Sequence, residues 1–239
     1  MTTALVLSAG GMFAAWEVGV WKALCGRLRP EMIVGASAGA WNGWAIAGGA
    51  SPGDLAGNWM DPLTRKIMRP GLHRFGLLLP EALNEKAREL FSRYRPRMPF
   101  GLTMVEVPRL QPCLVRDPQI TWQHLAATAS IPFGFPPVEI ESKLYVDGGF
   151  IGALPLWAAE RMGATRAIAV NCLTTMPFRM LRTFLPPPRP SGALEVILIE
   201  PSVRLGSLKD AAVWSEENIR RWMDLGERDG NRAATSITM

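Results

Sequence analysis

The chain has 239 residues, a length that suits one large domain or two small ones. Hydrophobic residues make up 48% and charged residues 20%, which excludes a disordered chain and allows a sizeable core. The net charge of +5 favours anionic partners, either lipid headgroups or nucleic acid. No pattern of a nucleic-acid-binding module is present, so we expect no nucleic-acid partner.

The cysteine and histidine content argues against a metal centre. Cys25, Cys113 and Cys172 lie far apart and match no metal-ligand spacing, and only two histidines accompany them. We therefore expect no metal and no cofactor. Separated cysteines are typical of a reduced cytoplasmic protein, and the N-terminus lacks the basic region of a secretory signal, since its first charge is Glu17. The sequence predicts a cytoplasmic location and leaves a peripheral position at a membrane open.

The N-terminal part predicts a βαβ unit. An apolar run over 4–8 predicts a buried strand, which breaks at Ala9-Gly10-Gly11. Apolar residues at helical spacing predict a helix over 12–28, and a second strand follows at 32–34. This order indicates a parallel sheet, and open α/β sheets place their sites at the carboxyl ends of such strands. We expect the backbone of the first glycine turn to face the turn after the second strand.

That second turn is Gly35-Ala36-Ser37-Ala38-Gly39, a Gly-x-Ser-x-Gly pattern. It predicts a sharp bend from strand to helix that presents Ser37, with glycines on both sides because side chains there would collide with neighbouring backbone. The N-terminus of the following helix would direct free N–H groups toward negative charge beside the hydroxyl.

A transmembrane helix is the alternative interpretation of this stretch. Residues 32–53 carry no charge, and Gly35, Gly39 and Gly43 repeat at the four-residue spacing of packed membrane helices. Against it, the many glycines give the segment a low mean hydropathy for a membrane span. A helix packed closely on a sheet needs the same small residues.

The remaining elements follow from periodicity and breakers. Prolines predict an irregular segment over 51–80, with one or two helical turns at 54–59. Residues 80–94 predict an amphipathic helix that either packs on the sheet or forms a lid or a lipid-facing element. Beyond it, the sequence predicts paired strands at 102–107 and 112–115, a helix at 122–129, a strand at 144–146, a helix at 154–162, a strand at 167–170, an exposed loop at 177–192, a strand at 196–199 and a terminal helix at 209–228.

The histidines restrict how the serine could be activated. A serine hydroxyl is a poor nucleophile until a base takes its proton. His73 and His124 both precede Asp147, so a hydrolase triad in the order Ser, Asp, His cannot use Asp147 as its acid. A triad of Asp61 or Asp117 with His124 can be written, but nothing around these residues indicates a site.

Asp147 is the better candidate base. It ends an apolar strand and precedes Gly148 and Gly149, so its carboxylate can approach another loop closely. In a partly desolvated cleft its pKa would rise toward a range useful for a base. On its own, however, Asp-Gly-Gly favours a simple turn.

Several segments together resemble patatin-like phospholipases, in the order and spacing of that family. They lie between residue 5 and about residue 160: Leu5 to Gly11, Val18 to Leu24, Val34 to Gly39, Ala129 to Val138, and Tyr145 to Gly149 followed by Pro155.

The resemblance implies both the architecture and the chemistry. It implies a single domain over 1–239, with a mostly parallel central sheet flanked by helices in three α/β/α layers and a helical closure over 200–239. It implies a dyad without histidine, in which Ser37 attacks a lipid or acyl ester, Asp147 acts as its base, and water activated by Asp147 releases the fatty acid. The oxyanion hole would be formed by backbone N–H groups of Gly10, Gly11 and Met12.

The first glycine turn departs from the family, whose pattern is three glycines, a variable residue, Arg or Lys, and then Gly. Here Phe13 stands in place of the basic residue and Ala14 in place of the last glycine. Backbone donors survive side-chain changes, so we expect activity to be retained but altered. The departure keeps a second hypothesis open, a non-catalytic or weakly active lipid- or anion-binding protein on the same fold, because helix N-termini bind anions without chemistry.

Overall fold

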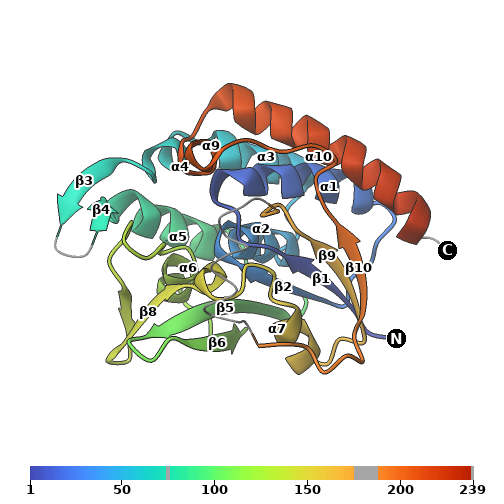
Figure 1. Cartoon of the computed structure of the whole chain (residues 1–239), viewed down its shortest axis with the longest axis horizontal. Coiled ribbons are helices and arrows are strands. Elements are labelled where there is room, and N and C mark those ends of the chain that lie inside the picture. The colour runs from blue at the N-terminus through green and yellow to red at the C-terminus, as the bar shows by residue number, and fades with distance from the viewer. Residues whose placement is uncertain (74–75, 175–187, 238–239) are drawn as a thin grey trace.

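The fold is built on an eight-stranded sheet in the computed structural model, which describes residues 1–73, 76–174 and 188–237 (Figure 1). Its strands are β1 (Thr3–Leu7), β2 (Met32–Ala36), β5 (Phe100–Val107), β6 (Gln111–Arg116), β7 (Val138–Ile140), β8 (Lys143–Asp147), β9 (Arg166–Val170) and β10 (Glu195–Ile199). Their order is β10-β9-β1-β2-β5-β8-β7, with β6 also paired to β5. The ladders from β10 to β5 are parallel, and those of β6, β7 and β8 are antiparallel. The expected, mostly parallel sheet is confirmed.

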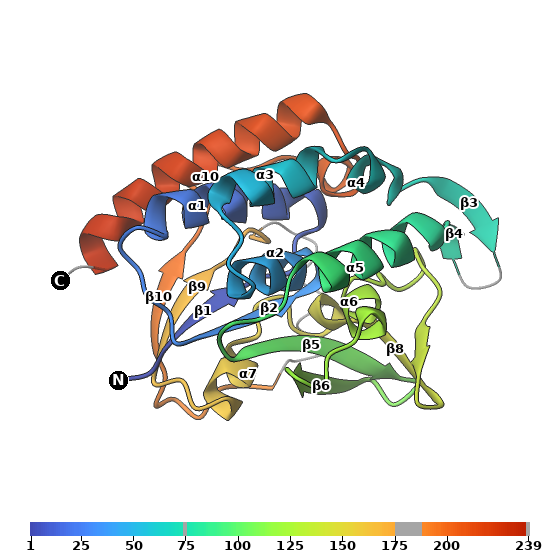
Figure 2. The ribbon, with the colours of Figure 1, turned by 180° about the vertical axis from the view of Figure 1, so that it is seen from behind.

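Helices cover both faces of this sheet. They are η1 (Gly11–Ala14), α1 (Ala15–Leu24), α2 (Ser37–Ala47), α3 (Pro52–Met60), α4 (Pro62–Lys66), α5 (Glu81–Arg93), α6 (Trp122–Thr128), η2 (Gly148–Phe150), α7 (Leu156–Arg161), α9 (Leu208–Ala212) and α10 (Glu216–Ile237). Along β1, Leu5 and Leu7 join the core cluster of α1, α2 and α10, whereas Ala4 and Val6 join that of α7. Successive strand residues point to opposite faces, so each face of β1 has its own core. Figure 2 shows α1, α2, α3 and α10 on one side of the sheet and α7 on the other.

The segment over 51–80 is more regular than predicted, although the helical turns expected at 54–59 are present in α3. The structure has α3, α4 and a hairpin of β3 (Pro70–His73) and β4 (Gly76–Leu78) in this region. Pro52 and Pro62 each occupy the first turn of a helix, where a missing N–H costs nothing, so these prolines start helices. Ser51 and Asp54 complete a capping box at α3.

The terminal helix also differs from its prediction. The expected helix over 209–228 is two helices, because Val213 is extended after α9 and α10 begins only at residue 216. The helix expected over 12–28 is likewise shorter and starts with the 3-10 turn η1. Most of the loop expected at 177–192 lies outside the described residues, since 175–187 are not described. The other expected strands and helices are present within a few residues of their predicted ends.

Close helix packing explains the glycines that resembled a membrane pattern. A Cβ on Gly43 of α2 would lie 3.0 Å from both Ile33 and Phe100 of the sheet. In α10, a Cβ on Gly226 would lie 2.0 Å from the carbonyl oxygen of Trp16 in α1. Small residues thus let helices approach the sheet and one another. Among the described residues, no helix is long and apolar enough to cross a membrane.

Candidate active site

Ser37 lies at the bend between β2 and α2. Its φ of 54° is left-handed, an uncommon conformation for a residue with a side chain. A Cβ on Gly39 would lie 2.3 Å from the carbonyl oxygen of Ser8, and one on Gly35 would lie 2.5 Å from the Cα of Ala40. Both flanking glycines are therefore required by the close approach of neighbouring backbone, as predicted. The fold holds the serine in a strained turn that presents its hydroxyl.

The structure brings Ser37 and Asp147 together across 110 residues of chain. The Oγ of Ser37 donates a hydrogen bond of 2.5 Å to Oδ2 of Asp147. The other carboxylate oxygen, Oδ1, accepts one of 2.6 Å from the backbone N–H of Gly149. The backbone N–H of Ser37 donates to Oγ1 of Thr128 at 3.0 Å. The hydroxyl and the carboxylate are thus aligned before any substrate enters.

β5 sets this alignment through its register. It is parallel to β2, with Thr103 opposite Ala36, and antiparallel to β8, with Met104 opposite Asp147. The serine bend and the aspartate therefore flank consecutive residues of one strand. Asp147 reaches the carboxyl end of the parallel strands although β8 runs in the opposite direction. A Cβ on Gly148 would lie 2.1 Å from the carbonyl oxygen of Thr103, so this crossing requires glycine.

Burial controls the charge of Asp147. Desolvation raises the pKa of this carboxyl from 3.8 to about 7, and the hydrogen bonds from Ser37 and Gly149 offset only part of the shift. No ion pair joins Asp147 to a basic side chain within the described ranges. A carboxylate with a pKa near neutrality can both take up and return a proton at physiological pH.

The first glycine turn lies beside the dyad. Gly11 has φ of 56°, and a Cβ there would lie 2.5 Å from the carbonyl oxygen of Ala211. Among the described residues, the backbone N–H groups of Gly11 and Met12 donate to no loop or turn carbonyl oxygen. Gly10 and Gly11 line the same cavity as Ser37 and Asp147. The first glycine turn and the two side chains thus share one cavity.

Phe13 and Ala14 have a structural role. Both are fully buried, and the ring of Phe13 meets Trp222 of α10 edge-on, with centroids 5.0 Å apart at an angle of 89°. Such aromatic pairs stabilise a core beyond the area that they bury. The aromatic side chain that replaces the family's basic residue thus ties the turn to the terminal helix and leaves its backbone donors in place.

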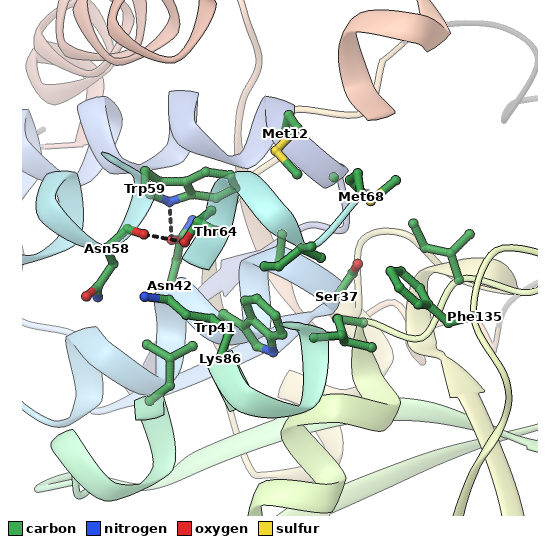
Figure 3. Close-up of a pocket in the computed structure, with 17 residues that line it drawn as sticks. Met12, Ser37, Trp41, Asn42, Asn58, Trp59, Thr64, Met68, Lys86 and Phe135 are labelled. Carbon is green, nitrogen blue, oxygen red and sulfur yellow. Dashed lines mark hydrogen bonds between the residues drawn. The ribbon is translucent and has the colours of Figure 1, made fainter. Parts of the chain in front are cut away.

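Two cavities meet at Ser37. The larger, of about 400 Å³, also contains Asp147, and its rim comes from the 131–134 loop and α9. The smaller, of about 60 Å³, is mostly apolar and lies between α2, α4 and α5 (Figure 3). Ser37, Trp41, Met68 and Phe135 line it, and Figure 3 shows Ser37 between Trp41 and Phe135. The buried face of α5 forms one wall of this cavity, so the helix packs against the body of the protein.

The histidine-based alternatives find no support in this geometry. His124 belongs to the capping box of α6, where its Nδ1 accepts a hydrogen bond from the backbone N–H of Thr121. It lines neither cavity, and burial lowers its pKa. Asp61 pairs with Lys86 at 2.8 Å. Within the described ranges, no group of three or more His, Cys, Asp and Glu residues could hold a metal ion.

Sequence reasoning missed Glu17, a buried carboxyl behind the first glycine turn. Its Oε1 accepts from the backbone N–H of Ser8 at 2.9 Å, and its Oε2 accepts from Nδ2 of Asn42 at 3.1 Å. Trp59 donates to the amide oxygen of the same Asn42. Desolvation raises the pKa of Glu17 to about 8. A lone charge inside the apolar stretch 12–21 was the available signal.

Glu17 makes stability fall as pH rises. An acid with a raised folded pKa binds a proton in the folded state that it lacks when unfolded, so stability is lost between the unfolded pKa of 4.5 and the folded pKa of about 8. We expect Glu17→Gln to remove a slope of about 1.4 kcal/mol per pH unit across this window. Urea unfolding at several pH values measures this slope. An unchanged slope would show that Glu17 is ionised in the folded protein.

Comparisons with known proteins identify a family model, relatives and a structural neighbour of this chain. A family model described as patatin-like phospholipase matches residues 5–160. Uncharacterized NTE family proteins of Mycobacterium bovis and Mycobacterium tuberculosis are 26% identical over 182 residues, covering 70% of this chain and 48% of theirs. The chain thus spans about half the length of these curated relatives. The crystal structure of VipD from Legionella pneumophila aligns with a TM-score of 0.55 at 11% identity, covering 98% of this chain and 67% of that one. At that identity the likeness shows a shared fold alone.

Proposed function

The chain belongs to the patatin-like phospholipase family, and from this premise we propose that it is a serine acyl-ester hydrolase acting on lipid esters through Ser37 and Asp147. The observation that carries the proposal is the 2.5 Å hydrogen bond from the Ser37 hydroxyl to the Asp147 carboxylate in a buried site. No histidine is needed, because burial raises the pKa of Asp147 to about 7.

The first half of the reaction forms an acyl-enzyme. The Oγ of Ser37 attacks the ester carbonyl carbon while its proton passes to Oδ2 of Asp147. The oxyanion of the tetrahedral intermediate accepts hydrogen bonds from backbone N–H groups of Gly10, Gly11 and Met12, which carry the electrostatic stabilisation. The carbon–oxygen bond to the alcohol then breaks, and Asp147 returns its proton to the departing alkoxide. The alcohol leaves, and the acyl group stays on Ser37.

The second half reverses these roles with water. Asp147 takes a proton from a water molecule that attacks the acyl carbonyl carbon. The resulting intermediate collapses, Ser37 regains its proton from Asp147, and the carboxylic acid departs. The larger cavity, of about 400 Å³, is lined by apolar residues apart from Ser37 and Asp147, so it suits the acyl chain of the ester.

A fluorophosphonate probe tests the nucleophile directly. We expect one covalent adduct on the wild-type protein, mapped to Ser37 by mass spectrometry, because the probe's phosphorus reacts with an activated serine hydroxyl. Ser37→Ala should carry no adduct, and the surface variant Ser92→Ala should react as the wild type does. An unreactive wild-type protein would contradict the proposal and favour a non-catalytic lipid- or anion-binding protein on the same fold.

A further inference from the structure

Exposed apolar side chains gather around the opening of the larger cavity. We call this the mouth surface and define it by its exposed apolar residues, which are Leu77, Ile131, Phe133 and Leu208. Ile131 and Leu208 line the cavity itself. Leu77 precedes Leu78 and Phe133 lies between Pro132 and Gly134, all three of which line it. The exposed residues are therefore continuous with the cavity wall.

The β3–β4 hairpin and the 131–134 loop form one platform. Phe133 pairs with Gly76 in an isolated bridge, and the backbone N–H of Leu78 donates to the carbonyl oxygen of Gly134 at 2.9 Å. These two contacts hold Leu77 and Phe133 on adjoining segments. Figure 1 shows the hairpin extending beyond the end of α5, away from the rest of the chain.

Phe133 is held in solvent by a defined turn. Its side chain is 82% exposed, and its φ of 65° is left-handed, which is strained for a bulky residue. The turn closes with hydrogen bonds from the N–H groups of Gly134 and Phe135 to the carbonyl oxygen of Ile131, and the buried ring of Phe135 anchors it. Leu77 is 65% exposed beside it. The turn therefore presents an aromatic ring to solvent.

Cations flank the mouth surface. Lys66 and Arg69 precede the hairpin and Lys209 follows Leu208, and all three are exposed. The carbonyl oxygen of Arg69 accepts from the backbone N–H of Leu79, which places Arg69 at the base of the hairpin. None of the three enters an ion pair within the part of the chain that the structure describes.

Acidic residues on these elements are fewer. Asp210 forms the capping box of α9 with Ser207, and Asp61 at the start of α4 pairs with Lys86. Arg65 of α4 is a further exposed cation, so the described cations on α4, at the hairpin base and on α9 outnumber the acidic residues there. An apolar patch within a basic rim complements a bilayer with anionic headgroups, since apolar side chains enter the acyl boundary and cations meet the headgroups.

We propose that the mouth surface docks the protein on an anionic phospholipid bilayer, with the opening of the larger cavity facing the lipid. A lipid ester would then pass from the bilayer to Ser37 along apolar walls and would not cross water. This inference rests on the proposed function, because docking would serve to deliver lipid esters to Ser37. Binding to a bilayer is nevertheless measured independently of hydrolysis.

Vesicle flotation tests the apolar centre. We expect the wild-type protein and Ser37→Ala to float with phosphatidylcholine vesicles that contain phosphatidylglycerol. The double variant Leu77→Asp/Phe133→Asp should bind these vesicles about tenfold more weakly or worse, because it can no longer bury either side chain. Neither residue lines a cavity, so hydrolysis of a soluble short-chain ester should be unchanged. The matched control is Leu198→Asp on β10, at the far end of the sheet, where Leu198 is 50% exposed.

Charge reversal tests the basic rim. Lys66→Glu/Arg69→Glu should weaken binding to vesicles with phosphatidylglycerol and leave binding to pure phosphatidylcholine unchanged. Three results would each overturn the proposal. They are wild-type protein that does not bind the vesicles, a double variant that floats like the wild type, and a Leu198→Asp variant that loses binding. If the wild type formed a dimer but bound no vesicles, and the double variant lost the dimer, the mouth surface would instead contact a second copy of the chain. Vesicle binding without hydrolysis of any ester would overturn the proposed function and leave the docking surface standing.

Discussion

Replacing Ser37 with alanine is expected to lower kcat on a soluble chromogenic acyl ester by about 10⁴-fold or more. The substitution removes the only group that forms the acyl bond, and what remains is substrate binding and the backbone donors of the first glycine turn. Alanine tolerates the bend no worse than serine, since both carry a Cβ at φ of 54°. We therefore expect the melting temperature to change little.

The assay for this variant requires a control for contaminating esterases. Ser92→Ala, which alters an exposed hydroxyl on α5, should retain full turnover when it is purified in the same way. Burst kinetics should show one equivalent of alcohol released per wild-type active site and none from Ser37→Ala. Turnover by Ser37→Ala within tenfold of the wild type would refute its role as nucleophile.

Replacing Asp147 with asparagine is expected to lower kcat/KM by about 10²- to 10⁴-fold, because the amide keeps the shape of the carboxyl but cannot accept a proton. In the wild-type protein, kcat/KM should rise tenfold per pH unit below about 7 and level off above it. The rate rises with pH because only the deprotonated form of Asp147 is a base. Desolvation raises the pKa of Asp147, so this form predominates only above about pH 7. Stopped assays from pH 5 to 9 measure this profile.

Glu17 provides the matched control for the pH profile. It is the second buried carboxyl with a raised pKa, and it touches the first glycine turn but not the dyad. Glu17→Gln should leave the ascending limb near pH 7 in place. Asp147→Asn should abolish that limb and should also raise stability above pH 7, because the wild-type carboxylate must ionise in a buried site. If Glu17→Gln shifted the ascending limb of the pH profile, Glu17 and not Asp147 would be the base.

The local features of this site could be predicted from the sequence. The bend at Ser37 and the need for Gly35 and Gly39 follow from collisions within a few residues of chain, and the structure shows those collisions. The βαβ unit was equally accessible, because apolar periodicity and glycine turns are local signals. That Ser37 acts as nucleophile and Asp147 as base stays a prediction, although the structure places the two side chains in contact.

Non-local features escaped prediction for physical reasons. The direction of β8 depends on its pairing with β5, and no pattern within 143–147 encodes a partner 40 residues away. Pro52 and Pro62 are an exception, because Ser51 and Asp61 directly before them are local signals of a helix start that the interpretation as breakers overlooked. The burial of Phe13 depends on Trp222, which arrives 209 residues later.

The position of β1 in the sheet has a consequence for how the chain acquires its structure. β1 lies between β2, which follows it closely in the sequence, and β9, whose residues 166–170 are synthesised long after both. The helix α1 is covered only after α10 has been synthesised, because α10 packs on it. Pairings between such distant segments form slowly. β1 is therefore among the last strands of the sheet to be enclosed, and its apolar flank remains open to misassociation until β9 and α10 have been synthesised.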